Sequence, residues 1–174
     1  MTPSIRHSVL MAGLFGLFAT GCTVPPNTAP VSSKDAFIDS VLSTLTIEDK
    51  AGEMTQLTLD MVCAGKPGKV EEPHRLDPDK LVHVLVDLKV GSILNCAGHA
   101  YPPEQWHEVI SGIQSKAAEK PSGIPVLYGI DAIHGTTYTT GGVLGPQQLG
   151  LAATWDTTLV RKFAENAAQA VAYT

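Results

Sequence analysis

The strongest constraint on the fold is an alternation of short apolar runs with amphipathic helical segments. Three apolar runs predict β-strands, over residues 56–62, 92–95 and 124–130. After each run, apolar residues recur every three or four positions, which predicts helices that begin near Asp77, Pro102 and Asp156. Strands that alternate with helices favour a parallel sheet with right-handed crossovers. We therefore expect an α/β fold.

The number of these units indicates the architecture. A (β/α)8 barrel of the TIM type needs about 250 residues, whereas this chain has 174 and supplies about three βα units. We therefore expect the N-terminal part of such a barrel, with strand 124–130 buried on both sides because it is apolar throughout. Before the first strand, one helix is predicted over residues 34–45, lying on an apolar surface, and a second after Thr46 as N-cap. Gly91 is expected to end the helix that begins at Asp77, and residues 63–76 and 136–150 are expected to be loops.

The first residues are typical of an export signal. Residues 9–18 form an apolar stretch that is too short for a membrane span, which needs about 20 residues. Small residues then precede Cys22, in a pattern that resembles a bacterial lipobox, although an ordinary cleaved signal with a chance cysteine is the alternative. We predict a lipoprotein-type signal peptide over residues 1–21, lipidation of Cys22, a flexible tether over 22–33 and the partial barrel over 34–174. The chain is then expected in the periplasm, or at the outer membrane or cell surface, held to the membrane by its lipid.

The net charge bears on the binding partner of the chain, and its cysteines bear on a possible disulfide. Twelve Lys and Arg against seventeen Asp and Glu give a net charge of −5, which disfavours a nucleic-acid partner because such proteins carry a basic face. Export would permit a disulfide between Cys63 and Cys96, and two unpaired thiols are the alternative.

The segment with the most chemical information is strand 124–130 together with the residues just after it. The strand leads directly into Asp131, with His134 three residues later. Polar groups at the C-terminal ends of parallel strands face the functional site. Asp131 could accept hydrogen bonds from a polar ligand such as sugar hydroxyls, it could cap the following loop, or it could join His134 and His99 in a metal site. The metal interpretation lacks a further ligand motif, so no metal or cofactor is expected. The remaining histidines of the mature chain are predicted to be solvated or structural, namely His74, His83 and His107.

Residues 124–135, IPVLYGIDAIHG, resemble the strand-end motif of glycoside hydrolase family 3, the bacterial β-glucosidase type. Three further segments resemble that family in the same order, over residues 45–56, 90–95 and 145–156. The resemblance implies a (β/α)8 barrel followed by an α/β sandwich domain, and retaining hydrolysis of a terminal β-linked sugar, most often glucose. It also implies that Asp131 binds the hydroxyls of the non-reducing sugar of a β-glucoside or oligosaccharide, with His134 beside it in the substrate site.

This chain departs from the family pattern in two places. Gly145-Pro146 stands where Phe-Pro is usual, and Ala170 and Ala172 stand where Glu and Arg are expected. The resemblance also places the nucleophile and the acid/base on later segments, although retaining hydrolysis needs both carboxyl groups. We therefore expect this N-terminal piece to have no catalytic residue of its own and to be inactive alone. Two other functions stay open: a non-catalytic saccharide-binding surface lipoprotein, and a metal-dependent hydrolase that uses Asp131 and His134.

Overall fold

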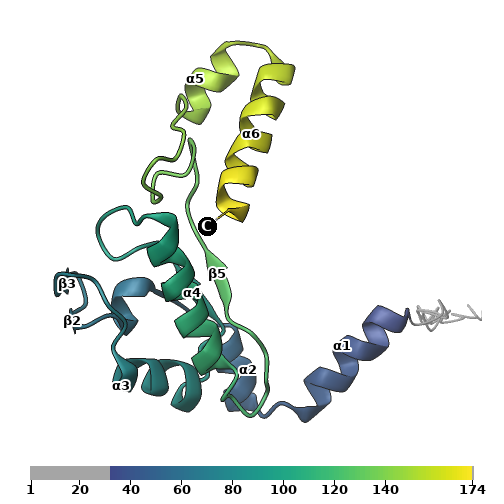
Figure 1. The fold of residues 1–174 in the computed structure, drawn as a ribbon. Helices are drawn as coiled ribbons and strands as arrows, with labels where there is room; N and C mark the ends of the chain where they lie inside the picture. The colour runs from purple at the N-terminus through teal and green to yellow at the C-terminus, as the bar shows by residue number, and fades with distance from the viewer. Residues whose placement is uncertain (1–31, 174) are drawn as a thin grey trace, which may run out of the picture.

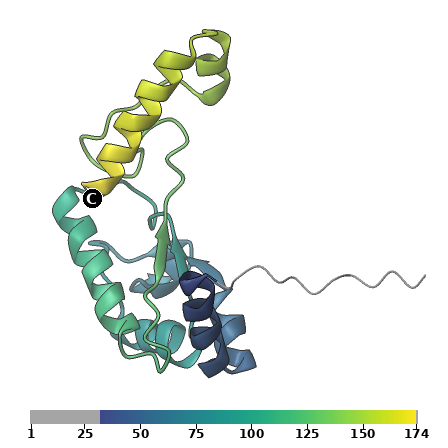
Figure 2. The same ribbon diagram turned by 90° about the vertical axis from the view of Figure 1, so that its right-hand side faces the viewer.

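The computed structural model describes residues 32–173. They form a mixed α/β structure (Figures 1 and 2). Three parallel strands are paired in the order β1 (Gln56–Thr58), β4 (Ser92–Leu94) and β5 (Leu127–Gly129). The predicted α/β class and the parallel sheet are confirmed, and the sheet is not closed into a barrel. The predicted signal peptide, Cys22 and most of the tether lie outside the described residues. No helix within residues 32–173 is long and apolar enough to cross a membrane.

The strands are shorter than the sequence indicates: β1 is Gln56–Thr58, β4 is Ser92–Leu94 and β5 is Leu127–Gly129. Leu57, Ile93 and Tyr128 are paired in register across the sheet and face the packed helices. The prediction that the third strand is buried on both sides is wrong, because Leu127 is 72% exposed. Val126 and Tyr128 pack into the core on one face of the strand, and Leu127 points to the opposite face, which is left open among residues 32–173.

The first strand does not continue to Val62 as predicted. After Thr58 the chain turns into a 3-10 helix, η1 (Leu59–Val62), and both of its end residues are fully buried. Residues three apart lie on one side of a 3-10 helix but on opposite faces of a strand, so the turn buries both apolar side chains in one core. The segment predicted as a loop then holds a two-stranded hairpin, β2 (Gly65–Lys66) with β3 (Lys69–Val70).

Helix starts follow the predicted capping residues. Thr46 and Asp49 form a reciprocal capping box at α2 (Ile47–Glu53). The Asp77 carboxylate accepts hydrogen bonds from the first backbone N–H groups of α3 (Pro78–Leu81), and Asp156 does the same for α6 (Thr157–Ala172). Each cap satisfies N–H groups that have no partner within the helix, which is why these local signals are reliable.

The end of the α3 helix differs from the prediction. The helix continues as a π-helix, η2 (Val82–Asp87), and the chain then leaves it through Lys89, which has a left-handed φ of 58°. Gly91 therefore does not end the helix. It is buried against α2, where a Cβ would lie 2.7 Å from the Cα of Glu53, so only glycine fits this close approach of the two backbones.

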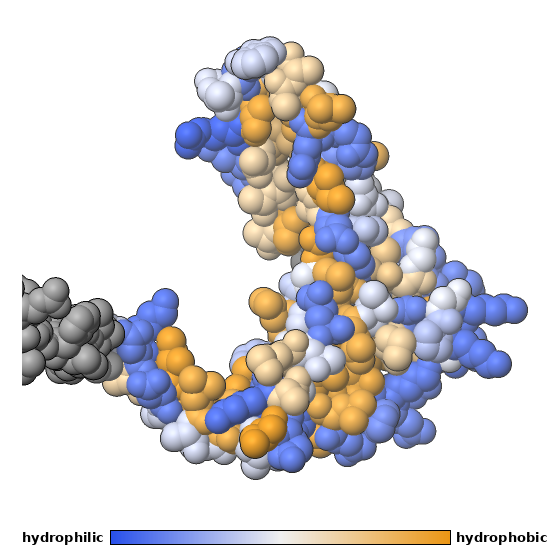
Figure 3. All heavy atoms as spheres, turned by 180° about the vertical axis from the view of Figure 1, so that it is seen from behind, coloured by the Kyte–Doolittle hydropathy of each residue, from blue (hydrophilic) through white to orange (hydrophobic). Residues whose placement is uncertain are grey.

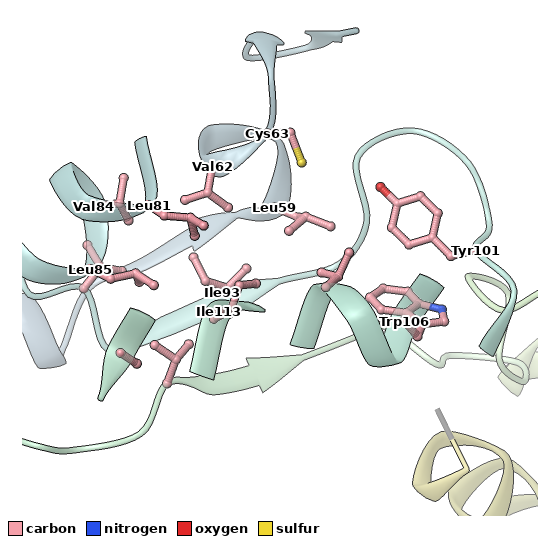
Figure 4. Packing of buried hydrophobic residues seen from close by; sticks show 14 residues of the cluster. Leu59, Val62, Cys63, Leu81, Val84, Leu85, Ile93, Tyr101, Trp106 and Ile113 are labelled. Atoms are coloured by element: carbon pink, nitrogen blue, oxygen red, sulfur yellow. The ribbon is translucent and has the colours of Figure 1, made fainter. Parts of the chain in front are cut away.

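The hydrophobic core lies between the sheet and the helices α3, η2 and α4 (Pro103–Ala117). Ile93 of the central strand and Ile113 of α4 are fully buried at its centre, and Trp106 closes the end near Tyr101 (Figure 4). Burial of such side chains contributes about 1.5–3 kcal/mol each. The described residues thus enclose one continuous core on one face of the sheet.

Three helices project from this core. No residue of α1 (Ser33–Thr44) or α6 is buried, and α5 (Gln148–Ala153) buries one leucine (Figure 1). The predicted apolar support under the first helix is absent among residues 32–173, since Phe37 of α1 is 67% exposed. That helix also begins earlier than predicted, with Ser32 as its cap. Apolar side chains gather along the hollowed side between the projecting helices (Figure 3).

Candidate functional site

The carboxyl ends of β4 and β5 meet at one edge of the sheet. Leu94 is paired with Gly129, and the backbone N–H of Asn95 donates to the Gly129 carbonyl at 2.8 Å, which extends the pairing by one residue. Asn95 then takes a left-handed φ of 59°, a conformation that asparagine tolerates better than most residues. The chain turns out of the strand there, and the Asn95 side chain lies beside the residues just after β5.

Asn95 holds Asp131 at two points. The Asn95 amide Nδ2 donates to the carboxylate Oδ2 of Asp131 at 2.8 Å, and the backbone N–H of Asp131 donates to Asn95 Oδ1 at 2.9 Å. The Tyr128 hydroxyl in turn donates to the Asn95 carbonyl at 2.5 Å. Asp131 itself is exposed, so a fixed carboxylate is presented at the sheet edge. The sequence interpretation missed Asn95, although it follows an apolar strand directly, as Asp131 does.

A hollow of about 390 Å³ lies beside this edge, between the ends of β1 and β4. Asp60, Asn95 and Tyr138 are among its lining residues. Hydrogen bonds from Thr58 and from the Gly68 backbone N–H, the latter at 2.7 Å, lower the pKa of Asp60. Burial, and then the charge of Asp131, raise the pKa of Tyr138. At neutral pH the hollow therefore presents an ionised carboxylate, an amide and a phenol, which are groups that bind hydroxylated ligands.

His134 lies against its own loop. Its ring Nδ1 is 3.2 Å from the carbonyl oxygen of Gly145, and the Gly145 backbone N–H donates to the His134 carbonyl at 2.7 Å. These two contacts join His134 to Gly145 and so hold together the two ends of the loop between them. His134 thus orients this loop, and its role toward a substrate stays a prediction.

The structure does not bring together the residues of the metal interpretation that the sequence left as an alternative. Within residues 32–173, the donor atoms that converge belong to Glu72, His74 and His99, and this group includes neither Asp131 nor His134. His74 was predicted to be solvated or structural. Its side chain is only 5% exposed and its ring contacts those of Tyr101 and His99, which agrees with the structural alternative.

The two departures from the family pattern have visible consequences. The ring of Phe163 in α6 fills the space where a side chain at position 145 would lie. An aromatic group therefore still packs against this loop, but it comes from α6 and not from the loop itself. Ala172 lines an open hollow of about 730 Å³ between α5, α6 and residues 132–133, and this lining is apolar except for Gln148 among the described residues. It offers little hydrogen bonding to a sugar, so we place the candidate site at the polar edge near Asp131.

Cys63 and Cys96 are free thiols in this structure, so of the two alternatives for this pair the unpaired one is observed. Cys63 is buried, and this burial raises the pKa of its thiol to about 11. It is therefore protonated at neutral pH and a poor nucleophile.

Comparison with known proteins decides the family. The model of the Glycosyl hydrolase family 3 N terminal domain matches residues 46–174. The chain belongs to glycosyl hydrolase family 3. The matched residues include the three strands, the Asn95–Asp131 pair and the helices after them. The resemblance seen in the sequence is therefore confirmed.

Curated relatives within the family are named as β-glucosidases. The lysosomal beta glucosidase of Dictyostelium discoideum is 32% identical over 135 residues, which are 72% of this chain and 16% of the relative. The beta-glucosidase C of Emericella nidulans is 32% identical over 141 residues, or 75% of this chain and 21% of the relative. The probable beta-glucosidase C of Aspergillus flavus is 30% identical over 138 residues, with the same two shares. The chain thus spans about a fifth of the length of these relatives.

Proposed function

We propose that this chain forms the first part of the barrel of a retaining exo-β-glycosidase that acts on terminal β-linked glucose, and that Asp131 binds the hydroxyls of that sugar. One observation carries the proposal. The Asp131 carboxylate is exposed and held by the Asn95 amide at the carboxyl edge of a parallel sheet, which is where α/β enzymes place their sites. The relatives that are named as β-glucosidases suggest the substrate class.

A fixed carboxylate suits this role. An ionised carboxylate accepts hydrogen bonds from hydroxyls, and such charge-assisted bonds are about twice as strong as neutral ones. Because Asn95 already orients the Asp131 carboxylate, less ordering is needed when the sugar binds. In a glycosidase, contacts with sugar hydroxyls that strengthen in the transition state increase kcat as well as affinity.

We also propose that residues 1–174 alone do not hydrolyse glycosides. Retaining hydrolysis uses two carboxyl groups about 5–5.5 Å apart that flank the scissile bond. Asp60 and Asp131 follow β1 and β5, which are separated by β4, and the Asp60 carboxylate already accepts the Gly68 N–H. Neither residue is therefore offered as nucleophile or acid/base. These groups would come from the part of the family's length that this chain does not span.

The test compares two proteins with a chromogenic β-glucoside. We expect no turnover by residues 1–174, and turnover with retention of anomeric configuration by the polypeptide read through to the natural stop codon of the gene. In that longer protein, Asp131→Ala should lower kcat/KM by roughly a hundredfold or more, and Asn95→Ala should lower it less. An unchanged kcat/KM in Asp131→Ala would remove Asp131 from the site. Saccharide binding without turnover would instead favour the non-catalytic surface lipoprotein.

We further propose that the chain is exported and anchored by a lipid on Cys22. The apolar stretch over residues 9–18 and the small residues before Cys22 support this proposal. Metabolic labelling with a radioactive fatty acid should mark the wild-type protein and not Cys22→Ser. Cys96→Ser is the matched control and should be labelled normally. Labelling that survives in Cys22→Ser would contradict the anchor.

A further inference from the structure

A cluster of two histidines and a glutamate lies outside the candidate sugar site. His74 comes from the segment between β3 and α3, His99 from the loop after β4, and their rings stack with centroids 4.2 Å apart. Glu72 Oε1 lies 3.1 Å from His74 Nε2 and 3.5 Å from His99 Nδ1. One donor atom of each residue lies within 4.8 Å of the other two. The three side chains thus converge from two separate loops.

The second nitrogen of His74 has a partner of its own. Its Nδ1 is 2.8 Å from the hydroxyl of Tyr101, a residue that is fully buried in the core. When Nδ1–H donates to that hydroxyl, the lone pair of Nε2 faces Glu72 and His99. A ligating histidine almost always donates its other ring N–H to a fixed acceptor, which sets the tautomer and the ring orientation. Tyr101 therefore supplies the outer partner that a metal-ligating His74 needs.

We propose that His74, His99 and Glu72 bind a divalent transition-metal ion of the zinc type. Two imidazoles and one carboxylate are common zinc ligands, and three protein ligands with a water in the fourth position make a tetrahedral site. The nitrogen donors favour zinc-type ions over magnesium and calcium, which prefer oxygen. His99 and Glu72 are 50% and 66% exposed in their side chains, so both can turn the short distance that ligation requires, while buried His74 stays in place.

The bound ion would connect two loops near the sheet edge. The loop after β4 begins at Asn95 and reaches His99 four residues later, so an ion held between His99 and His74 fixes this loop to the segment before α3. The proposal assigns the ion no part in glycoside cleavage. It does not depend on the glycosidase proposal, because its test measures metal binding alone.

The test measures Zn²⁺ binding by the untagged full chain, using equilibrium dialysis with metal analysis, and Co²⁺ binding by its visible absorption spectrum. We expect one ion per chain and the intense spectrum of tetrahedral Co²⁺. His99→Ala and Glu72→Gln change exposed side chains and should preserve the fold, which circular dichroism can check. Each should weaken Zn²⁺ binding by more than about tenfold.

Two control variants separate this site from other ligands. His107→Ala removes an exposed histidine of α4 that lies outside the cluster. Cys96→Ser removes the less buried of the two free thiols. Both should bind Zn²⁺ as the wild type does. Binding that is unchanged in His99→Ala and Glu72→Gln, or that is lost only in Cys96→Ser, would overturn the proposal, as would the absence of stoichiometric binding in the wild type.

Discussion

The ion pair between Lys120 and Glu53 allows a test of how burial determines the contribution of an ion pair to the free energy of unfolding. Lys120 Nζ lies 2.8 Å from Glu53 Oε1, with side chains that are 0% and 15% exposed, and the Ser122 hydroxyl donates to the same oxygen at 3.1 Å. The pair joins the end of α2 to the turn after α4. Lys120→Met removes the ammonium and leaves the Glu53 carboxylate in a poorly solvated place. Breaking a buried pair in this way costs about 3–5 kcal/mol.

The same helix region offers a matched control. Lys116 forms an ion pair with Glu119 at the same distance of 2.8 Å, but these side chains are 25% and 57% exposed. Lys116→Met should therefore cost less than about 1 kcal/mol, because water solvates the charge that remains. Urea denaturation followed by tryptophan fluorescence measures both changes, since Trp106 is buried in the core and reports its loss.

A double variant tests the effect of the unpaired Glu53 carboxylate. Lys120→Met with Glu53→Gln should be more stable than Lys120→Met alone by about 0.5–3 kcal/mol, the usual coupling between residues in contact. If Lys120→Met and Lys116→Met lower the free energy of unfolding equally, or if the added Glu53→Gln recovers nothing, burial does not control this interaction and the reasoning is wrong.

Three further outcomes are expected from the structure. Hydrogen bonds from Lys89 and Thr46 lower the pKa of Asp49 from 3.8 to about 2, so this carboxylate stabilises the fold above pH 3.8 and ceases to do so as the pH falls through 2. The stability deficit of Asp49→Asn measured at pH 7 should therefore shrink between pH 4 and pH 2, and a constant deficit would contradict this. Cys63 should react with a thiol reagent at pH 8 far more slowly than Cys96, because burial raises its pKa to about 11, and equal rates would refute it. Backbone amides of α6 should exchange with deuterium much faster than those of β4, since no residue of α6 is buried, and equal protection would show that α6 is stabilised by contacts absent from this structure.

Local signals in the sequence predicted the local structure well. The caps at Thr46, Asp77 and Asp156 were identified correctly because each acts on N–H groups within three residues of itself. The alternation of apolar runs and helical stripes likewise gave the parallel sheet. The turn at Leu59 was missed, because a short apolar run fits a strand or a tight helix equally until its packing partners are known.

Features that depend on distant residues were harder to predict. The exposure of Leu127 depends on which element covers the last strand, and no pattern within the strand contains that information. Asp131 was proposed as a site residue from its place after a predicted strand, whereas its partner Asn95 is 36 residues away and becomes its neighbour only through the register of β4 and β5. The cluster of Glu72, His74 and His99 was missed for the same reason, since two separate loops bring it together.

The Asn95 contact affects how this site can vary. Asp131 is fixed from the neighbouring strand, through its side chain and its backbone N–H, rather than by the long segment after it. The exposed positions of that segment, such as Ile133 and Val143, can therefore be substituted without loss of the contacts that hold the carboxylate. Members of the family can diverge at these positions while the anchoring of Asp131, the proposed acceptor for sugar hydroxyls, is inherited unchanged.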